Sequence, residues 1–547
     1  MKLKIFGGGG EVTGSNYMLD LGSKKILIDC GSHQGSNSAK HENEIFEYDA
    51  SEICALLVTH AHIDHSGKIP LLVKRGFKGN IFCTYATAEL LPILLHDSAK
   101  IMAEDAQWQT RKNARKGLPA VEPLYTEKDV DKALEHIVPV AYDEVTQICD
   151  GVSARFREAG HILGSAIIET WLAKNDGTDD KVKVVFSGDL GQKEGAIEKP
   201  PTVIEDADFA LIESTYGDRK HKSLEETRSE FQAAMEEAIS SGGKVLVPTF
   251  VVDRAQRMLY EFKLLEKKYE GRITKMPKIY LDSPMGVKTT EIYSKYAGLL
   301  AKPIRDMLLA GEDPFEPGDF KFVRTSEESR AVNDVKDAVV LAGGGMCAGG
   351  RILHHIKNNA YKKSTHIFFV GYQAYGTLGR RIVDGAKTVR IGGEPISIKA
   401  KLHTLNGFSA HADRDDLLEW AEHFPKDTQF IVVHGEPAAS RSLAGAIADK
   451  GYFTRVPANG DTIDLLAPAP ENARMPMVAK QIIDNVQFTG KDIEDALNKI
   501  SARALQIGEK LAGIQKLDKN TLPLLISAVT LLETVNYLNA DNDDTGK

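Results

Sequence analysis

Residues 56–70 read LLVTHAHIDHSGKIP, a short apolar run that leads directly into a cluster of histidines and one aspartate. The apolar run predicts a buried strand, and the polar cluster falls in the loop that follows it. In such a loop His60 and His62 can fold around one centre, while Asp64 and His65 reach a neighbouring one. Neutral imidazole and carboxylate are the ligands that zinc takes where thiolate is absent. A lone histidine is more often structural, but this clustering predicts a metal-binding loop.

Two metal ions need more ligands than one loop supplies, and three other segments offer them. His161 in EAGHILGS, Asp189 in VVFSGDLG and His434 in FIVVHGE each follow apolar or β-rich residues and precede a glycine. This context predicts a polar side chain at the rim of a sheet. With the loop at residues 60–65, the three residues provide enough ligands for two sites.

Composition limits the class of protein and the kind of metal ligand. The 547 residues are 42% hydrophobic and 27% charged, which is typical of a globular protein with more than one domain. The five cysteines are widely spaced and form no CxxC pair, so neither a disulfide framework nor a thiolate zinc site is expected. A formal net charge of −9 argues against a protein coated in nucleic acid, but not against a local basic channel. With no apolar stretch long enough for a bilayer, we expect a cytoplasmic protein without membrane contact.

The order of predicted elements indicates an α/β fold. Short strands alternate with glycine-rich turns up to residue 59, and the helices expected at residues 224–239 and 253–269 flank the buried strand KVLVPTF. The proline-rich stretch 468–477 reads as a linker. Beyond it, apolar residues from Ile493 to Ile514 recur at spacings of four and three, as in a heptad seam. This seam fits a helical hairpin packed on its own protein or a homodimer contact.

The ligand set, together with Asp29 at the end of KKILIDC, resembles the metallo-β-lactamase superfamily. The resemblance implies an αββα sandwich of two sheets with a dinuclear metal site at the rim. It assigns His60, His62 and His161 to the first zinc, and Asp64, His65 and His434 to the second. Asp189 would bridge the two ions, and Asp29 would orient the groups bound to them.

Further motifs resemble, in order, the β-CASP nucleases of this superfamily, which carry a second α/β domain inserted in the first. They are ESTYGDR, VPTFVVDRAQ, YLDSPMG, GGGMCAGGR, GYQAYGTLGRR and GFSAHAD. The similarity is to bacterial and archaeal homologues of the eukaryotic pre-mRNA 3′-end-processing endonuclease. It implies a metallo-β-lactamase domain at residues 1–214 and 396–467, a β-CASP domain at residues 215–395 and, outside the resemblance, a helical extension at residues 478–540.

The resemblance gives catalytic roles to Asp64, Glu213 and His411. His411 would be the general acid that protonates the leaving oxygen, and the carboxylate of Glu213 would favour its protonated form. Ser409, His411 and Asp413 can equally form a polar helix start, with Asp413 as the cap of residues 414–423. The expected substrate contacts are Gly344, Gly345, Arg351, Arg380 and Ser409. A tight turn is the alternative for the glycines, and a helix cap is the alternative for Arg380.

The expected function is therefore a zinc-dependent ribonuclease that cuts single-stranded RNA internally, with two Zn²⁺ per chain. Histidine at position 434 favours RNA, because the DNA-repair branch of the family usually carries valine there. Mn²⁺ or Fe²⁺ could replace zinc, since histidine and aspartate do not select strictly among these ions. The alternatives are a 5′-exoribonuclease, a hydrolase of another phosphate ester, and an inactive RNA-processing scaffold.

Overall fold

The computed structural model describes residues 1–34, 39–174, 178–269, 276–371, 373 and 376–467. The described residues belong to one compact unit. The linker at residues 468–477, the helical extension at residues 478–540 and its heptad seam lie outside the described residues. The homodimer expected from that seam therefore stays a prediction.

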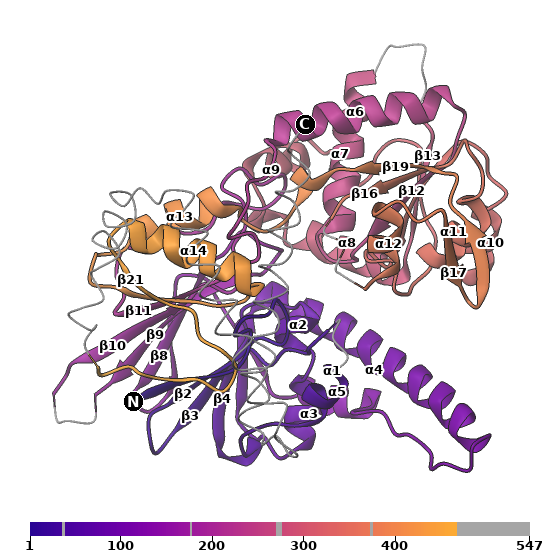
Figure 1. The fold of residues 1–547 in the computed structure, drawn as a ribbon. Coiled ribbons are helices and arrows are strands. Elements are labelled where there is room, and N and C mark those ends of the chain that lie inside the picture. Colours follow the sequence, from indigo (N-terminus) through magenta and orange to yellow (C-terminus); the bar gives the residue numbers. More distant parts are fainter. Residues whose placement is uncertain (35–38, 175–177, 270–275, 372, 374–375, 468–547) are drawn as a thin grey trace, which may run out of the picture. The chain divides into compact units, whose positions relative to one another are not determined.

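Two seven-stranded sheets pack against each other and share one hydrophobic core (Figure 1). In order across the first sheet, the strands are β22 (Thr462–Asp464), β1 (Lys2–Gly7), β2 (Asn16–Asp20), β3 (Lys25–Ile28), β4 (Ile53–Leu57), β5 (Asn80–Thr84) and β6 (Ile137–Val140). In order across the second sheet, they are β21 (Phe453–Arg455), β20 (Gln429–Val432), β11 (Phe209–Ile212), β10 (Lys181–Phe186), β9 (Ala166–Ala173), β8 (Val152–Glu158) and β7 (Val145–Cys149).

Alternate side chains along a strand pack on different neighbours, which shows what covers each face of these sheets. On β3, Ile26 and Ile28 belong to the core between the two sheets, whereas Leu27 packs into the cluster that includes α4. Leu211 of β11 likewise faces the core between the sheets, and Ile212 packs into the cluster that includes α13 and α14. Because successive side chains of a strand point to opposite faces, each sheet has one face on its partner and one under helices. This arrangement confirms the predicted αββα sandwich.

A third sheet of six strands follows β11 in the chain, and all of its pairings are parallel. In order across the sheet, the strands are β14 (Phe320–Phe322), β13 (Lys278–Asp282), β15 (Ala338–Gly343), β12 (Val245–Thr249), β16 (His366–Phe369) and β19 (Lys401–Thr404). The chain then returns to the second sheet, where β20 pairs with β11. A separate α/β layer is thus inserted between two neighbouring strands of the sandwich, as the predicted fold class requires. The sheet includes β19, which follows the predicted domain boundary at residue 395.

Helices cover both faces of the third sheet. Apolar residues of α6, α7 and α8 pack with Val245 and Val247 of β12, whereas α11 and α12 pack with Leu246. Figure 1 shows α6 and α7 along one side of the sheet and α11 along the other. An antiparallel hairpin of β17 (Thr388–Ile391) and β18 (Glu394–Ser397) lies next to α12 in the chain.

The helices include those predicted at residues 224–239, 253–269 and 414–423, each within one residue of the predicted bounds. They are α1 (Ala39–Glu44), α2 (Ile63–Ser66), α3 (Ile69–Lys74), α4 (Tyr85–Ala114), α5 (Glu127–Leu134), α6 (Leu224–Ser240), α7 (Arg254–Tyr269), α8 (Pro284–Lys295), α9 (Lys302–Leu309), α10 (Ser326–Val332), α11 (Ile352–Asn359), α12 (Leu378–Val383), α13 (Arg414–Glu422) and α14 (Pro437–Asp449). Short 3₁₀ turns occur at Ala50–Glu52, Ala297–Leu299 and Asn406–Phe408. The carboxylate of Asp413 accepts hydrogen bonds from Asp415 N and Asp416 N, which confirms its predicted role as the α13 cap.

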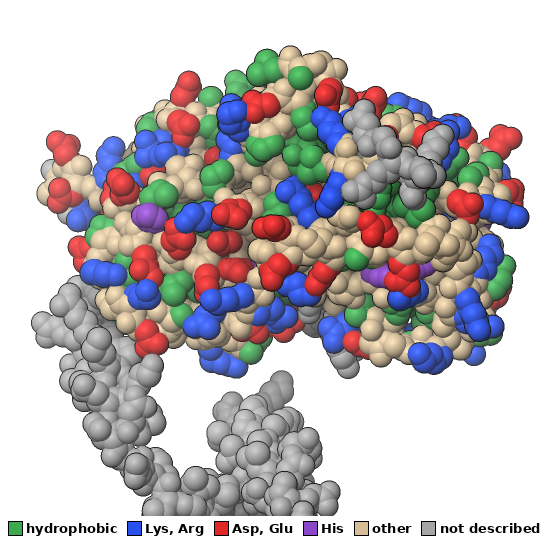
Figure 2. Space-filling view, turned by 90° about the horizontal axis from the view of Figure 1, so that it is seen from above, with side chains coloured by type: hydrophobic (Ala, Val, Ile, Leu, Met, Phe, Trp, Pro, Cys, Tyr) green, Lys and Arg blue, Asp and Glu red, His purple; other side chains and the backbone are tan. Residues whose placement is uncertain are grey.

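Acidic and basic side chains are interspersed over the face shown in Figure 2. This mixture agrees with the small negative net charge of the sequence. Within the described residues, no helix combines the length and the apolar character that crossing a membrane requires.

Candidate metal centre

The loop at residues 58–62 connects β4 to the short helix α2. Hydrogen bonds from α2 to backbone carbonyls of the loop hold it in place. Ser66 Oγ donates to Ala61 O at 2.9 Å, and His65 N donates to His62 O at 3.0 Å. The imidazoles of His60 and His65 are buried by this turn. Asp64 and His65 stand at the start of α2, so the one loop carries side chains to two neighbouring positions.

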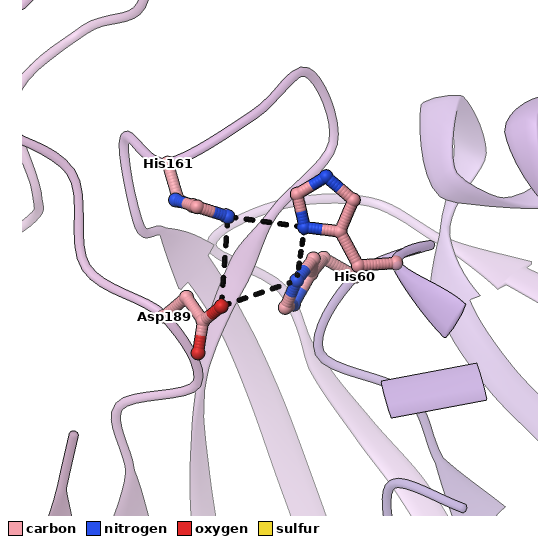
Figure 3. A group of neighbouring side chains, drawn as sticks. His60, His161 and Asp189 are labelled. Atoms are coloured by element: carbon pink, nitrogen blue, oxygen red, sulfur yellow. Dashed lines mark hydrogen bonds and ion pairs between the residues drawn. The ribbon is translucent and has the colours of Figure 1, made fainter. Parts of the chain in front are cut away.

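Four ligand atoms converge on the first position. His62 Nδ1 lies 3.1 Å from His60 Nε2 and 3.2 Å from His161 Nε2. Asp189 Oδ2 lies 3.5 Å from the Nε2 atoms of both His60 and His161 (Figure 3). His161 follows β8 and Asp189 follows β10, so the strand ends of the second sheet complete what the loop begins.

The second position uses the other oxygen of the same carboxylate. Asp189 Oδ1 lies 3.3 Å from His65 Nε2 and 3.4 Å from His434 Nε2. Asp64 belongs to the same group of neighbouring ligand atoms as His65 and His434. Asp189 therefore stands between both groups, and all seven predicted ligands come together.

The donor set fits metal ions better than it fits a hydrogen-bonded protein core. Among the described residues, the buried atoms His65 Nε2 and Asp189 Oδ1 have no hydrogen-bond partner. Burial lowers the pKa of His60 and that of His161 well below the usual range, which leaves neutral rings with free lone pairs. A tetrahedral zinc site with bonds of about 2.0–2.1 Å separates neighbouring ligand atoms by roughly 3.3 Å, close to the spacings of the first group.

Three side chains hold the ligands from behind. Asp29 Oδ2 lies 2.7 Å from His65 Nδ1, and the two carboxylate oxygens of Asp29 accept the amide and the hydroxyl of Thr59. Ser15 Oγ lies 2.8 Å from His434 Nδ1. These contacts fix the ring orientations and leave the Nε2 atoms facing the metal positions. Asp29 was predicted in this role, whereas Thr59 and Ser15 were missed because single hydroxyl residues before or after a strand carry no distinctive pattern.

The backbone is strained at two of these positions. Asp29 has φ of 59° and His434 has φ of 48°, in the left-handed region that glycine usually occupies. Such conformations persist where surrounding contacts enforce them, and they concentrate at functional sites. At His434 the amide donates to Gly8 O at 2.7 Å, which ties the glycine-rich turn after β1 to the site.

His411 lies beside the first group of ligands and is held by Glu213. Its Nδ1 is 3.2 Å from Glu213 Oε1 and 4.0 Å from Asp189 Oδ2, and its ring centroid is 4.4 Å from that of His161. The amides of Leu190 and Thr215 donate to Glu213, which fixes the carboxylate. Burial opposes protonation of His411, but Glu213 outweighs it and raises the pKa to about 9.

The residues expected to contact substrate divide into two groups. Ser409 lies at the site, where its hydroxyl accepts from His411 N at 3.2 Å. The other four are on the inserted domain and already have partners within the chain. Gly344 N donates to Thr249 O, and Gly345 O accepts from Gln373. Arg351 binds Asp282, and Arg380 pairs with Asp384 one turn away.

Three family models match successive parts of the chain. The metallo-β-lactamase superfamily matches residues 9–135, the β-CASP domain matches residues 255–382, and the Zn-dependent metallo-hydrolase RNA specificity domain matches residues 395–457. The fold and the site thus define a metal-dependent hydrolase with a metallo-β-lactamase fold.

Curated relatives match nearly all of the described chain. Ribonuclease TTHA0252 of Thermus thermophilus is 38% identical over 452 residues, which cover 82% of this chain and 97% of the relative. Transcription termination factor FttA of Methanococcus maripaludis is 31% identical over 484 residues, which cover 85% and 72%. FttA of Methanosarcina mazei is 32% identical, with the same coverage. The chain belongs to the β-CASP family of the metallo-β-lactamase superfamily, as its sequence motifs predict.

Proposed function

We propose that the protein is a zinc-dependent ribonuclease that hydrolyses single-stranded RNA internally. The observation that carries the proposal is the position of Asp189, whose two oxygens face two separate groups of ligand atoms. His60, His62 and His161 would hold one ion, Asp64, His65 and His434 the other, and Asp189 both. Two metal ions held there would supply an activated water near neutral pH and would neutralise charge on the attacked phosphoryl group.

The side chains around this centre divide the remaining work. His411, held by Glu213 at 3.2 Å, would donate a proton to the leaving oxygen as its bond to phosphorus breaks. The carboxylate keeps the imidazole protonated, which is the form that an acid needs at the start of the reaction. Asp29 and Ser15 would keep His65 and His434 in the orientation that binding requires.

Two comparisons support RNA as the substrate. Residues 395–457 match a model described as an RNA specificity domain, and the Thermus relative is named a ribonuclease. This matched segment includes His411, which is proposed to transfer the proton, and His434, which is proposed to bind the second ion. A channel between the domains would suit an unpaired strand better than a duplex, because unpaired bases are free to stack on protein side chains.

The test uses RNA labelled separately at its 5′ and 3′ ends. An endonuclease releases labelled fragments of intermediate length from both ends, and a chelator stops their formation. A 5′-exonuclease instead releases mononucleotides early from the 5′ label alone. RNA left intact by the metal-loaded protein contradicts the proposal and favours an inactive scaffold. Faster hydrolysis of a simple phosphate ester, with RNA failing to compete, would indicate a hydrolase of another phosphate ester.

A further inference from the structure

Two nitrogens of one buried guanidinium lack a hydrogen-bond acceptor within the described part of the chain. Arg254 begins α7, is 8% exposed, and has Nε and Nη1 buried without a hydrogen-bond acceptor among the described residues. Leaving a guanidinium buried and unpaired is costly, because removal from water is not offset by a counter-charge. An anion from outside the chain would offset this cost.

The nearby carboxylates are already bound to a different arginine. Arg257 Nη2 lies 2.9 Å from Asp253 Oδ1 and 2.5 Å from Glu198 Oε2. Burial and the charge of Asp253 raise the pKa of Glu198 well above its usual range, which weakens it further as a counter-ion. The local acids are therefore paired with Arg257, and they act on Arg254 only through their charge.

Arg254 acts electrostatically on Tyr216, whose ring neighbours His411. Burial raises the pKa of Tyr216, and the positive charge of Arg254 opposes that shift, so the two groups are close. The ring of Tyr216 in turn lies 6.0 Å from the ring of His411. On another side, a Cβ added to Gly371 would stand 3.6 Å from Arg254 Nε, so the backbone after β16 passes close to the guanidinium.

An exposed aromatic ring stands in the same turn. Phe250 follows β12, is 40% exposed, and its carbonyl accepts from Ala255 N at 3.2 Å across the turn. A Cβ added to Gly345 would come within 2.8 Å of the Phe250 ring, so the glycine backbone supports that ring directly. A large apolar ring that is fixed in place and open to solvent is the kind of platform on which unpaired bases stack.

We propose that the turn from β12 to α7 binds one nucleotide of the RNA, with Arg254 on its phosphate and Phe250 on its base. The inference rests on RNA as the substrate class proposed above and adds a specific contact point on the inserted domain. A guanidinium suits a phosphate because it offers several donors in one plane. The same turn explains why Gly345 carries no side chain, since a Cβ there would come within 2.8 Å of the Phe250 ring.

The experiment measures binding, by fluorescence anisotropy, of a single-stranded RNA of about 12 nucleotides to full-length protein carrying His411→Ala. In a series of such RNAs, one phosphate at a time is replaced by a neutral methylphosphonate. We expect one position to weaken binding in the parent protein and to have no effect once Arg254→Met is added. The slope of log affinity against log salt should fall by about 0.7 in that variant, the value for one phosphate contact. Arg324→Met removes an exposed charge from the same domain and should leave the position effect intact.

The base contact has its own pair of variants. Phe250→Ala should weaken binding by roughly 5- to 150-fold, and Phe250→Tyr should restore it, because stacking needs only an aromatic face. Tyr361→Ala, which removes another exposed ring, should have no effect. If Arg254→Met fails to fold, Arg254→Lys takes its place. The methylphosphonate series on the parent protein then shows whether binding depends on one phosphate position, and the variant shows whether that dependence needs the guanidinium. Equal losses at all positions, or a position effect that persists without Arg254, overturn the inference.

Binding and cleavage are read separately, so the two proposals can fail independently. Protein that shows the Arg254 and Phe250 effects but leaves RNA uncut contradicts the ribonuclease and keeps the nucleotide site. Protein that cuts RNA without either effect keeps the ribonuclease and removes the site.

Discussion

Two buried aspartates among the described residues have histidine neighbours, and of these two clusters the one around Asp189 fits a metal. At the rim of the sandwich, Asp189 faces the rings of His60, His65, His161 and His434. On the inserted sheet, Asp282 follows the same kind of strand end. There Oδ1 accepts from Arg351 at 2.5 Å, and Oδ2 accepts from Ser329 at 2.5 Å and lies 2.7 Å from His355 Nε2.

The difference lies in the balance of donors and acceptors. Each oxygen of Asp282 has a donor, so this carboxylate is fully paired within the chain, although His355 Nδ1 has no hydrogen-bond partner among the described residues. Asp189 Oδ1 has no hydrogen bond among the described residues, and the facing nitrogens compete for the same space. A carboxylate oxygen that faces several imidazoles without a hydrogen bond needs a cation, whereas a carboxylate with a donor on each oxygen does not. Residue types alone do not separate the two cases.

The largest difference between the clusters should come from removing one histidine. His62→Ala takes a ligand atom from the first group, and we expect RNA cleavage to fall by about 1,000-fold or more, since loss of a supporting contact alone typically costs 10- to 100-fold. His355→Ala, the matched change in the Asp282 cluster, should leave cleavage at the parental rate per folded molecule. Initial rates with end-labelled RNA measure both. Equal losses in the two variants would mean that the clusters do not differ in function.

Loss of His411 should strongly lower the rate of RNA cleavage but should not release metal. His411→Ala removes the proposed acid and should lower the cleavage rate by about 100- to 10,000-fold, with metal content unchanged. His423→Ala, an exposed histidine directly after α13, is the control and should behave as the parent. Rates and elemental analysis on the same preparations check this. A metal content that falls with the rate would make His411 a ligand, and an unchanged rate would remove it from the reaction.

Asp29→Asn should weaken metal binding without abolishing it. The amide keeps the shape of the side chain but holds His65 Nδ1 less strongly, and we expect an affinity for zinc about 10- to 100-fold lower. Competition with a chromogenic chelator gives the affinity directly. Asp282→Asn is the counterpart and should leave zinc affinity at the parental value; a matching loss there would contradict the separation of the clusters.

Asp282→Asn should instead lower the stability of the fold, by about 1–3 kcal/mol in the free energy of unfolding. Burial raises the pKa of Asp282, but its bonds to His355, Ser329 and Arg351 outweigh burial and hold the pKa below the usual value. The stabilisation is therefore present above an unfolded-state pKa of about 3.9 and is lost as pH falls below it. Urea titrations at neutral and acidic pH check both statements. A variant as stable as the parent at neutral pH would show that the cluster contributes nothing.

The sequence predicted most of the metal centre because its signals are local. HAHIDH crowds four ligands into six residues, and His161, Asp189 and His434 each stand between an apolar run and a glycine. The predicted α13 cap and the helices α6 and α7 depend on equally local patterns. All of these reflect the chain within a few residues of the position concerned.

The residues that sequence reasoning missed or left open depend on partners far away in the chain. Ser15 reaches His434, and Arg351 reaches Asp282. Arg351 looked like a free cation at a helix start, but its partner comes from another strand. Gly344 looked open to phosphate, yet its amide is bonded to Thr249. In each case a contact between distant segments decides what a polar group can do, and no local pattern records it.

The central claim is that Asp189 stands between two metal ions, and the metal content of the full-length protein tests it most directly. Protein loaded with zinc and freed of excess ion by gel filtration should contain about two ions per chain by elemental analysis. Asp189→Asn, which removes one anionic oxygen that faces both groups, should contain clearly less. A loaded parent protein with one ion or none, or a variant that retains two, would contradict the account.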